Sequence, residues 1–211
     1  INATDRQYEK DNKTVVLTKG AVSLTGLVDN ETLDVNIPAT GSISDAKVGT
    51  YNVTYSGVTL ADGIGKASNY TLNAALPTIT VTISKAAAPV LADIPVSFKY
   101  TVTTGEKAIG DADVPADAGA LTYAKGTESK TGSVTVVSWD VDSTGKVAYT
   151  LSGGKAGDSV TLPVTISSAN YEDAVVKVVI TLIARDDQAE LRITGGTTVV
   201  YGQKLALGTS G

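Results

Sequence analysis

The sequence predicts an all-β protein, and three observations support this fold class. Thr and Val, which are branched at the β carbon and favour strands, make up about a quarter of the 211 residues. Apolar and polar residues alternate with a period of two in several runs, as in strands with one buried face. Clusters of Gly, Asn, Asp and Ser separate these runs at the short spacing of antiparallel sheets.

Alternation identifies the main strands in chain order. In each run the inward-facing residues are apolar, and no window of similar length has a clear helical stripe. The predicted inward faces contain Tyr51, Val53 and Tyr55; Ile79, Val81 and Ile83; Val96, Phe98, Tyr100 and Val102; Val160, Leu162, Val164 and Ile166; and Val176, Val178, Ile180 and Leu182.

A hairpin is predicted where residues 142–145 read Asp-Ser-Thr-Gly, between two apolar strands. Gly145 can adopt the positive φ of a type I turn followed by a bulge. In the strand before this turn, the apolar phase shifts between Val136 and Val137, so that Val137 joins the inward face with Trp139 and Val141. We therefore expect a β-bulge at that step.

Two segments follow one plan and indicate an internal repeat. Residues 67–84 and 168–184 each pass through Asn-Tyr and a turn into a terminal alternating strand. The period of about a hundred residues fits immunoglobulin-sized sandwiches. We predict tandem immunoglobulin-like β-sandwiches over residues 1–86 and 87–185, and a truncated start of a third repeat over 186–211. Residues 84–89, small and ending in Pro89, form a short and fairly stiff linker.

Composition excludes several classes of function. Without Cys, His or Met the chain has no thiol nucleophile, disulfide, imidazole base or Cys/His zinc site. The net charge of −5 disfavours binding to nucleic acid. The longest apolar stretches, such as residues 174–184, are too short to cross a bilayer, so we expect no membrane insertion by this segment. Since the chain begins at Ile1, we interpret it as a piece of a longer protein.

The first 85 residues resemble the YDG-type repeat of bacterial surface proteins. The similarity lies in the segments 8–12, 14–18, 26–27, 48–53, 58–60, 69–72 and 79–81. The signature position reads Tyr8, Glu9 and Lys10. Residues 89–184 are similar to a bacterial Ig-like module of multi-domain Firmicutes cell-surface proteins, and 198–207 resemble the start of another module. The resemblance implies a secreted or cell-surface setting, an adhesin or stalk role, and no catalytic residues.

Two acidic groups are weak candidates for calcium. Asp140, Asp142, Thr144 and Gly145 match the opening of a calcium loop, but Leu151 stands where the closing Glu belongs. We interpret this segment as a plain hairpin turn. The other group, in a loop with Pro115 and Gly119, consists of Asp111, Asp113 and Asp117. No pair of carboxylates is distinguished as a glycosidase site, so we predict no enzyme activity, no cofactor and no metal.

The aromatic residues are predicted to be structural. Trp139 alternates with Val137 and Val141, which indicates a core position rather than an exposed sugar-binding platform. Tyr70 and Tyr171 follow Asn69 and Asn170. Asn tolerates a left-handed turn, and we expect each Tyr to anchor a corner by packing its ring while its hydroxyl reaches backbone.

The sequence thus predicts a non-catalytic stalk or spacer of a bacterial cell-surface or secreted protein, whose partners are neighbouring repeats of the same chain. One alternative is a carbohydrate- or mucin-binding module, with a host glycan or surface protein as partner. Another is a module that self-associates through an exposed edge strand, with residues 191–207 as the exposed segment.

Overall fold

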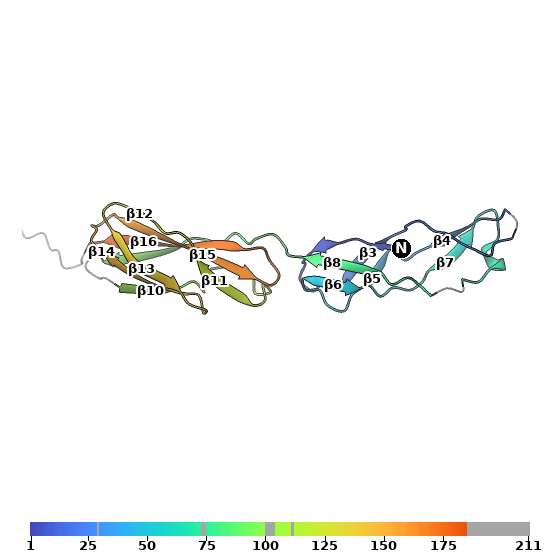
Figure 1. Cartoon of the computed structure of the whole chain (residues 1–211), viewed down its shortest axis with the longest axis horizontal. Coiled ribbons are helices and arrows are strands. Elements are labelled where there is room, and N and C mark those ends of the chain that lie inside the picture. Colours follow the sequence, from blue (N-terminus) through green and yellow to red (C-terminus); the bar gives the residue numbers. More distant parts are fainter. Residues whose placement is uncertain (29, 73–74, 100–103, 111, 185–211) are drawn as a thin grey trace, which may run out of the picture.

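The computed structural model describes residues 1–28, 30–72, 75–99, 104–110 and 112–184. Figure 1 shows an elongated molecule in which an N-terminal half (residues 1–86) and a C-terminal half (residues 87–184) lie end to end. The all-β prediction is confirmed: in the described ranges the only helical element is a 3-10 turn, Ala67–Asn69. Asp111 and the predicted third unit, 186–211, lie outside the described residues.

The N-terminal half contains short strands arranged in small sheets. Its strands are β1 (Asn2–Ala3), β2 (Arg6–Gln7), β3 (Thr14–Thr18), β4 (Leu33–Asn36), β5 (Thr40–Ser42), β6 (Gly49–Asn52), β7 (Thr59–Asp62) and β8 (Thr80–Ser84). The sheet orders are β1-β3-β5, β2-β8-β6 and the pair β4-β7. The β4-β7 pair lies at the end of this half that points away from the C-terminal half, which we call the far end (Figure 1).

The core of the N-terminal half lies between its two three-stranded sheets. β3 contributes Val15 and Leu17, and β8 contributes Val81 and Ile83, with Ile43 and Val53 completing the buried cluster. Tyr51 and Tyr55, which were predicted to share the inward face with Val53, pack against the cluster and are half-buried. The alternation seen in the sequence therefore identified the inward face.

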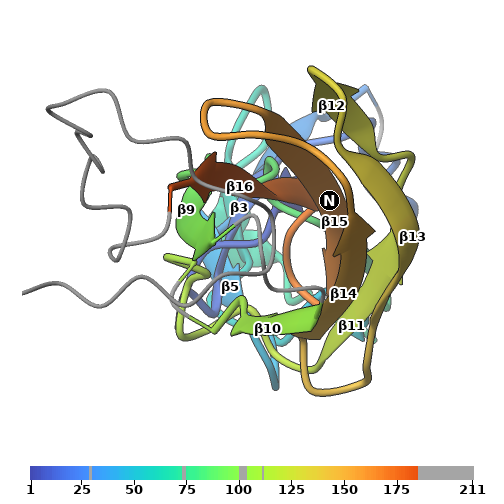
Figure 2. The same cartoon turned by 90° about the vertical axis from the view of Figure 1, so that its left-hand side faces the viewer.

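The C-terminal half has longer strands in two sheets. Its strands are β9 (Ile94–Lys99), β10 (Thr104–Ala108), β11 (Leu121–Lys125), β12 (Ser129–Thr131), β13 (Thr135–Val141), β14 (Lys146–Ser152), β15 (Ser159–Ser168) and β16 (Ala174–Ile183). One sheet has the order β10-β14-β13, and the other β11-β15-β16-β9 with β12 also paired to β15. Figure 2, which looks along the long axis, shows these strands wrapped around a common interior.

A single buried cluster fills that interior and takes side chains from both sheets. The predicted inward faces of β15 and β16 are almost completely buried, with Val160, Leu162, Val176 and Val178 all at 0% exposure. Phe98 on β9 packs edge-on against the ring of Tyr149 on β14, with 5.3 Å between the centroids. The two sheets therefore face each other across one continuous apolar layer.

The hairpin predicted at residues 142–145 is confirmed. β13 and β14 pair antiparallel, Gly145 has φ +79, and the Gly145 N–H donates to the Asp142 carbonyl at 3.0 Å. The predicted bulge is confirmed as well, because the register shifts between Val136 and Ser138. The inward assignment of Val137 was wrong: it is 60% exposed, because the extra residue of the bulge turns outward.

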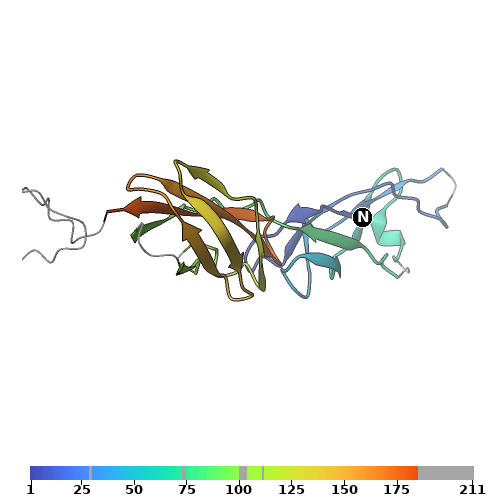
Figure 3. The ribbon, with the colours of Figure 1, turned by 60° about the vertical axis from the view of Figure 1, so that its left-hand side comes forward.

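The two halves share one feature of topology. In each, the terminal strand pairs in parallel with a strand near the start of that half: β2 with β8, and β9 with β16. The last residues of the terminal strands, Ser84 and Ile183, pair with Gln7 and Lys99. Figure 3 shows the two halves in line, joined by a single linker segment. The repeat seen in the sequence therefore has a counterpart in strand pairing.

Candidate functional site

The candidate site is the junction at which the two halves touch. Tyr8 comes from the N-terminal half and follows β2; its N–H donates to the Ser84 carbonyl at 2.8 Å, which places it beside the end of β8. Asp117 lies in the loop before β11, and Tyr171 lies between β15 and β16. These three side chains meet although Tyr8 and Asp117 are 109 positions apart in the chain.

Asp117 accepts hydrogen bonds from both tyrosines. The Tyr8 hydroxyl donates to Asp117 Oδ2 at 3.1 Å, and the Tyr171 hydroxyl donates to the same oxygen at 3.1 Å. The two rings contact each other edge-on, with 5.6 Å between the centroids and 73° between the planes. Edge-to-face packing and two hydrogen bonds to an ionised acceptor fix the orientation of all three side chains.

The protonation states at the junction support one another. Burial, followed by the hydrogen bond to Asp117, raises the pKa of Tyr8 to about 12. Burial and then the bond to Asp117 also raise the pKa of Tyr171. Burial alone would raise the pKa of Asp117, but hydrogen bonds from its own backbone N–H and from the two hydroxyls lower it overall. Near neutral pH the junction therefore contains one carboxylate and two protonated phenols.

The linker between the halves pairs with the C-terminal half at one β-bridge. The Ala86 N–H donates to the Asn170 carbonyl at 2.9 Å, and the Glu172 N–H donates to the Ala86 carbonyl at 2.8 Å. These bonds form an isolated parallel bridge between Ala86 and Tyr171. Small alanine side chains allow this close approach of the backbones. This bridge is a backbone restraint on residues 84–89, which the sequence predicts to be a fairly stiff linker.

A cavity of about 300 Å³ lies beside this junction. Its lining combines opposite charges, with Lys10, Asp11, Asp45 and Lys47 from the N-terminal half and Asp117 from the C-terminal half. Tyr8 and Tyr171, whose pKa values are raised, stay protonated at neutral pH and so cannot act as bases there. Asp117 already accepts a hydrogen bond from each of them. This arrangement is suited to holding two surfaces together.

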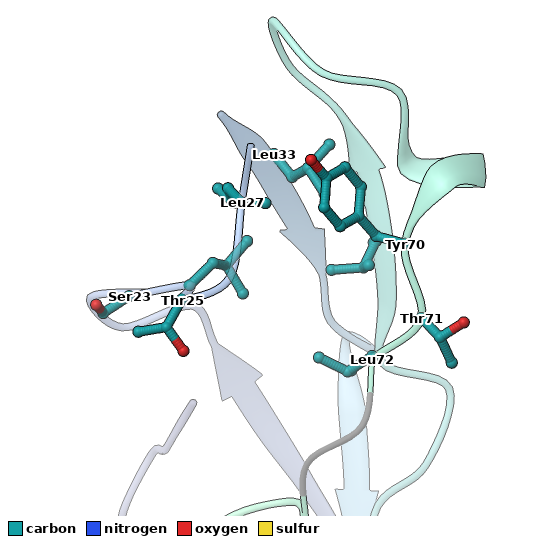
Figure 4. A pocket seen from close by; sticks show the side chains of 9 residues that line it. Ser23, Thr25, Leu27, Leu33, Tyr70, Thr71 and Leu72 are labelled. Carbon is teal, nitrogen blue, oxygen red and sulfur yellow. The ribbon is translucent and has the colours of Figure 1, made fainter. Parts of the chain in front are cut away.

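A second cavity, of about 260 Å³, lies at the far end of the N-terminal half (Figure 4). The labelled side chains lie on a loop, on β4 and on the segment that follows the 3-10 turn. The lining combines leucines with hydroxyl-bearing side chains in similar numbers: Ser23, Leu24, Thr25, Leu27, Leu33, Leu60, Tyr70, Thr71 and Leu72. We call this cavity the far-end cleft.

Tyr70 stands at the edge of the far-end cleft. Its hydroxyl donates to Glu31 Oε2 and accepts the Val28 N–H at 3.1 Å. The hydrogen bond to Glu31 raises the pKa of Tyr70. A loop carboxylate and a tyrosine that follows an asparagine thus occur together here, as they do at the junction.

The acidic residues considered for calcium have other contacts. Asp142 Oδ1 accepts the Thr144 N–H at 2.8 Å and the Lys146 N–H at 3.0 Å, which caps the hairpin. Asp140 and Asp113 are exposed, whereas Asp117 belongs to the junction. Within the ranges that the structure describes, no group of three or more acidic side chains is placed to hold a metal ion.

Trp139, predicted to be a core residue, is 6% exposed. Its indole Nε1–H donates to Glu128 Oε2 at 3.0 Å, and the Lys125 ammonium lies 5.6 Å from its ring centroid. The indole is therefore covered by protein on its polar edge as well as within the cluster.

Neither asparagine adopts the left-handed conformation that this residue type tolerates. Asn69 and Asn170 are absent from the non-glycine residues with positive φ, which are Asp11 and Asn30 in the described chain. Asn69 ends the 3-10 turn and is exposed. Asn170 is 5% exposed, and its Nδ2 donates to the Asp117 carbonyl at 2.7 Å. The Asn170 side chain therefore connects the turn before β16 to the loop that contains Asp117.

Sequence reasoning missed the partners of the two tyrosines. It expected the hydroxyls to reach backbone, but Tyr171 donates to the carboxylate of Asp117, and Tyr70 donates to Glu31. Tyr8 was noted only as the signature position of a repeat. One signal was present: each Asn-Tyr pair is preceded, within the same half, by a loop that carries acidic residues.

Comparisons with known proteins assign no family. No protein-family model matches the chain, and no curated protein matches it. Among solved structures, the human desmocollin-1 ectodomain is similar over 88% of this chain, with 14% sequence identity and a TM-score of 0.33. The chain spans 41% of the length of that ectodomain. In the described ranges no helix is long and apolar enough to span a membrane.

Proposed function

We propose that the chain is a non-catalytic spacer segment of a bacterial cell-surface or secreted multi-domain protein. The junction carries the proposal. A flexible tether between domains needs no specific contact, whereas here Tyr8, Asp117 and Tyr171 interlock, and Ala86 adds a strand pairing. Contacts of this kind hold two bodies in line, so that chain length becomes reach.

Each half, in this proposal, is an immunoglobulin-like β-sandwich, and the boundary between them lies near residue 86. The supporting observations are the two sheets around the C-terminal core, the two three-stranded sheets around the N-terminal core, and the separate buried clusters on either side of Ala86. The resemblance of residues 1–85 to YDG-type repeats, and of 89–184 to a bacterial Ig-like module, supports the surface or secreted setting.

Distance measurements between spin labels test the spacer role. The chain has no cysteine, so Val16→Cys and Val175→Cys provide the only labelling sites. Val16 on β3 is 57% exposed and Val175 on β16 is 50% exposed, so neither label disturbs a core. Double electron–electron resonance on this doubly labelled chain should give one narrow distance distribution, because the junction fixes the angle between the halves.

Two variants connect that result to the junction. Tyr171→Ala removes the ring and hydroxyl that contact Tyr8 and Asp117, and should broaden the distribution. Tyr55→Ala is the matched control, because Tyr55 bonds the Pro77 carbonyl within the N-terminal half and should leave the distribution narrow. A broad distribution in the chain without either substitution would rule out a rigid spacer.

The carbohydrate-binding alternative has less support, because Trp139, the only tryptophan, is 6% exposed and cannot stack on a sugar ring. Reproducible binding on a glycan array that is abolished by Tyr70→Ala would favour that alternative over a spacer, since Tyr70 is the tyrosine that lines the far-end cleft.

A further inference from the structure

We infer that the far-end cleft is a docking site for a preceding β-module whose docking end resembles that of the N-terminal half of this chain, with a half-buried tyrosine equivalent to Tyr8 and a linker of small residues. This inference rests on the proposed spacer role, because such a site is useful only in a longer array. It follows from comparing the leading ends of the two halves, meaning the ends that point toward the start of the protein.

The leading end of the C-terminal half shows how docking occurs. There Tyr171 follows Asn170, its hydroxyl donates to the loop carboxylate of Asp117, and Tyr8 of the preceding half packs on its ring at 5.6 Å. The Tyr8 hydroxyl also donates to the Asp117 carboxylate, and Ala86 pairs with the backbone of Tyr171. The acceptor part of this junction is therefore an Asn-Tyr pair plus a loop carboxylate.

The leading end of the N-terminal half carries a similar tyrosine–carboxylate pair, although its asparagine is exposed whereas Asn170 is buried. Tyr70 follows Asn69, is half-buried, and donates its hydroxyl to the loop carboxylate of Glu31. Both tyrosines precede the terminal strand of their half, β8 or β16, and each of these strands pairs in parallel with a strand near the start of the half, β2 or β9. The two tyrosines thus occupy equivalent places in the topology.

The surroundings of Tyr70 leave room for an added partner. Among the described residues no aromatic ring packs against Tyr70, and the far-end cleft beside it, with a volume of about 260 Å³, is lined by both leucine and hydroxyl-bearing side chains. Large apolar side chains near it are also exposed: Val28 at 64%, Ile64 at 77% and Val22 at 44%. Burial of these exposed side chains by a docked module would be favourable, because apolar surface would be removed from water.

The register of the strands predicts how a preceding module would connect. Gln7 pairs with the last residue of β8, and Lys99 pairs with the last residue of β16. Counting back equally from Gln7 and Lys99, Ile1 occupies the place of Asp93. A segment equivalent to residues 84–92 would therefore lead directly into Ile1, and its alanines would lie against the backbone of Tyr70 as Ala86 lies against Tyr171.

The test uses the full chain extended at its start by a second copy of residues 1–92. Val16→Cys in both copies reports across the added junction, because Val16 is exposed on β3. We expect a single narrow distance distribution by double electron–electron resonance. Tyr70→Ala in the original copy should abolish the narrow component, whereas Tyr55→Ala in the same copy should retain it.

Hydrogen exchange gives a second measurement. The Val28 N–H, which donates to the Tyr70 hydroxyl, should exchange more slowly in the extended chain than in the chain of 211 residues, because docking would cover it. A broad distribution across the added junction, or unchanged exchange at Val28, would overturn the inference. If the Val16 and Val175 labels across the native junction still gave a narrow distribution, the spacer proposal would stand while this inference failed.

Discussion

The two halves of the molecule share the parallel pairing of their terminal strand but bury very different amounts of apolar side chain. In the C-terminal half, β15 and β16 are ten residues long each and form the centre of one large buried cluster. In the N-terminal half, the longest strands, β3 and β8, have five residues, and the cluster between them is small. Repetition of topology therefore does not imply equal stability, because stability depends on buried area.

This difference suggests that the N-terminal half depends more on its neighbours. Its far end has no continuous core: Leu33 and Leu60 line an open cleft instead of packing into a buried cluster. Its other end is held by the junction to a half with a larger core. In a chain of such modules, docking at both ends would compensate for a small interior.

A matched pair of core truncations tests the comparison most strongly. Ile180 on β16 and Ile83 on β8 are 0% and 1% exposed, so replacement by Ala removes the same atoms from each core. Such changes typically lower the free energy of unfolding by about 2–5 kcal/mol. We expect Ile180→Ala to fall near the upper end of this range and Ile83→Ala near the lower end, because the denser core relaxes less around a cavity.

Urea unfolding followed by circular dichroism and by Trp139 fluorescence measures both effects. Trp139 belongs to the C-terminal cluster, so its fluorescence reports that half alone. Equal costs for the two variants would contradict the comparison. A loss of Trp139 fluorescence at lower urea in Ile83→Ala would instead reveal that the junction couples the unfolding of the halves.

Two turn glycines sharpen the comparison at a smaller scale. Gly57 in the N-terminal half has φ +85 and open space where a Cβ would lie, whereas Gly145 has φ +79 and would place a Cβ 2.9 Å from the Tyr123 ring. Gly57→Ala should cost only the left-handed strain of about 1–2 kcal/mol. Gly145→Ala should cost more, because the ring must also move.

Thermal unfolding of the two glycine variants checks this expectation. The midpoint should fall further for Gly145→Ala than for Gly57→Ala. The reverse order would indicate that the N-terminal half is packed as tightly around its turns as the C-terminal half, against the comparison above.

The smallest expected effect is the pH dependence of the junction. The pKa of Tyr8 is raised from its ordinary value of 10.0 to about 12, so its contribution is complete below about pH 10 and is lost as pH rises through 12. The pKa of Asp117 is lowered from 3.8, so its contribution is present above that value and is lost as pH falls through its folded pKa.

Label distances across the native junction should therefore be narrow between about pH 4 and pH 10, and should broaden outside that window. Asp117→Asn keeps an acceptor oxygen but removes the charge, and should abolish the broadening at low pH. If the distances still broadened at low pH in Asp117→Asn, the titration of another group would be responsible.

Local pattern was sufficient to predict much of the fold. The inward faces of β15 and β16, the hairpin at Gly145 and the step of the bulge at Val136 all follow from period-two alternation and turn chemistry, which involve residues close in the chain. Val137 was assigned to the wrong face because a bulge can shift the phase either before or after its extra residue.

The candidate site was only partly predictable. Tyr171 and Asp117 were both singled out, one as a corner anchor and the other as a weak metal ligand, and neither expectation joined them. Nothing in the local sequence couples Tyr8 to residues beyond the linker. Glu31 likewise has no motif that points to Tyr70.

By itself the sequence determined that this chain is β-structured, where most of its strands face inward, and that it lacks the side chains of thiol and imidazole chemistry, since each of these depends on residue type and on neighbours in the chain. Only the tertiary structure decided which tyrosine meets which carboxylate and that Ala86 is a strand partner. Those contacts join groups up to 109 positions apart, and their formation depends on how whole sheets pack.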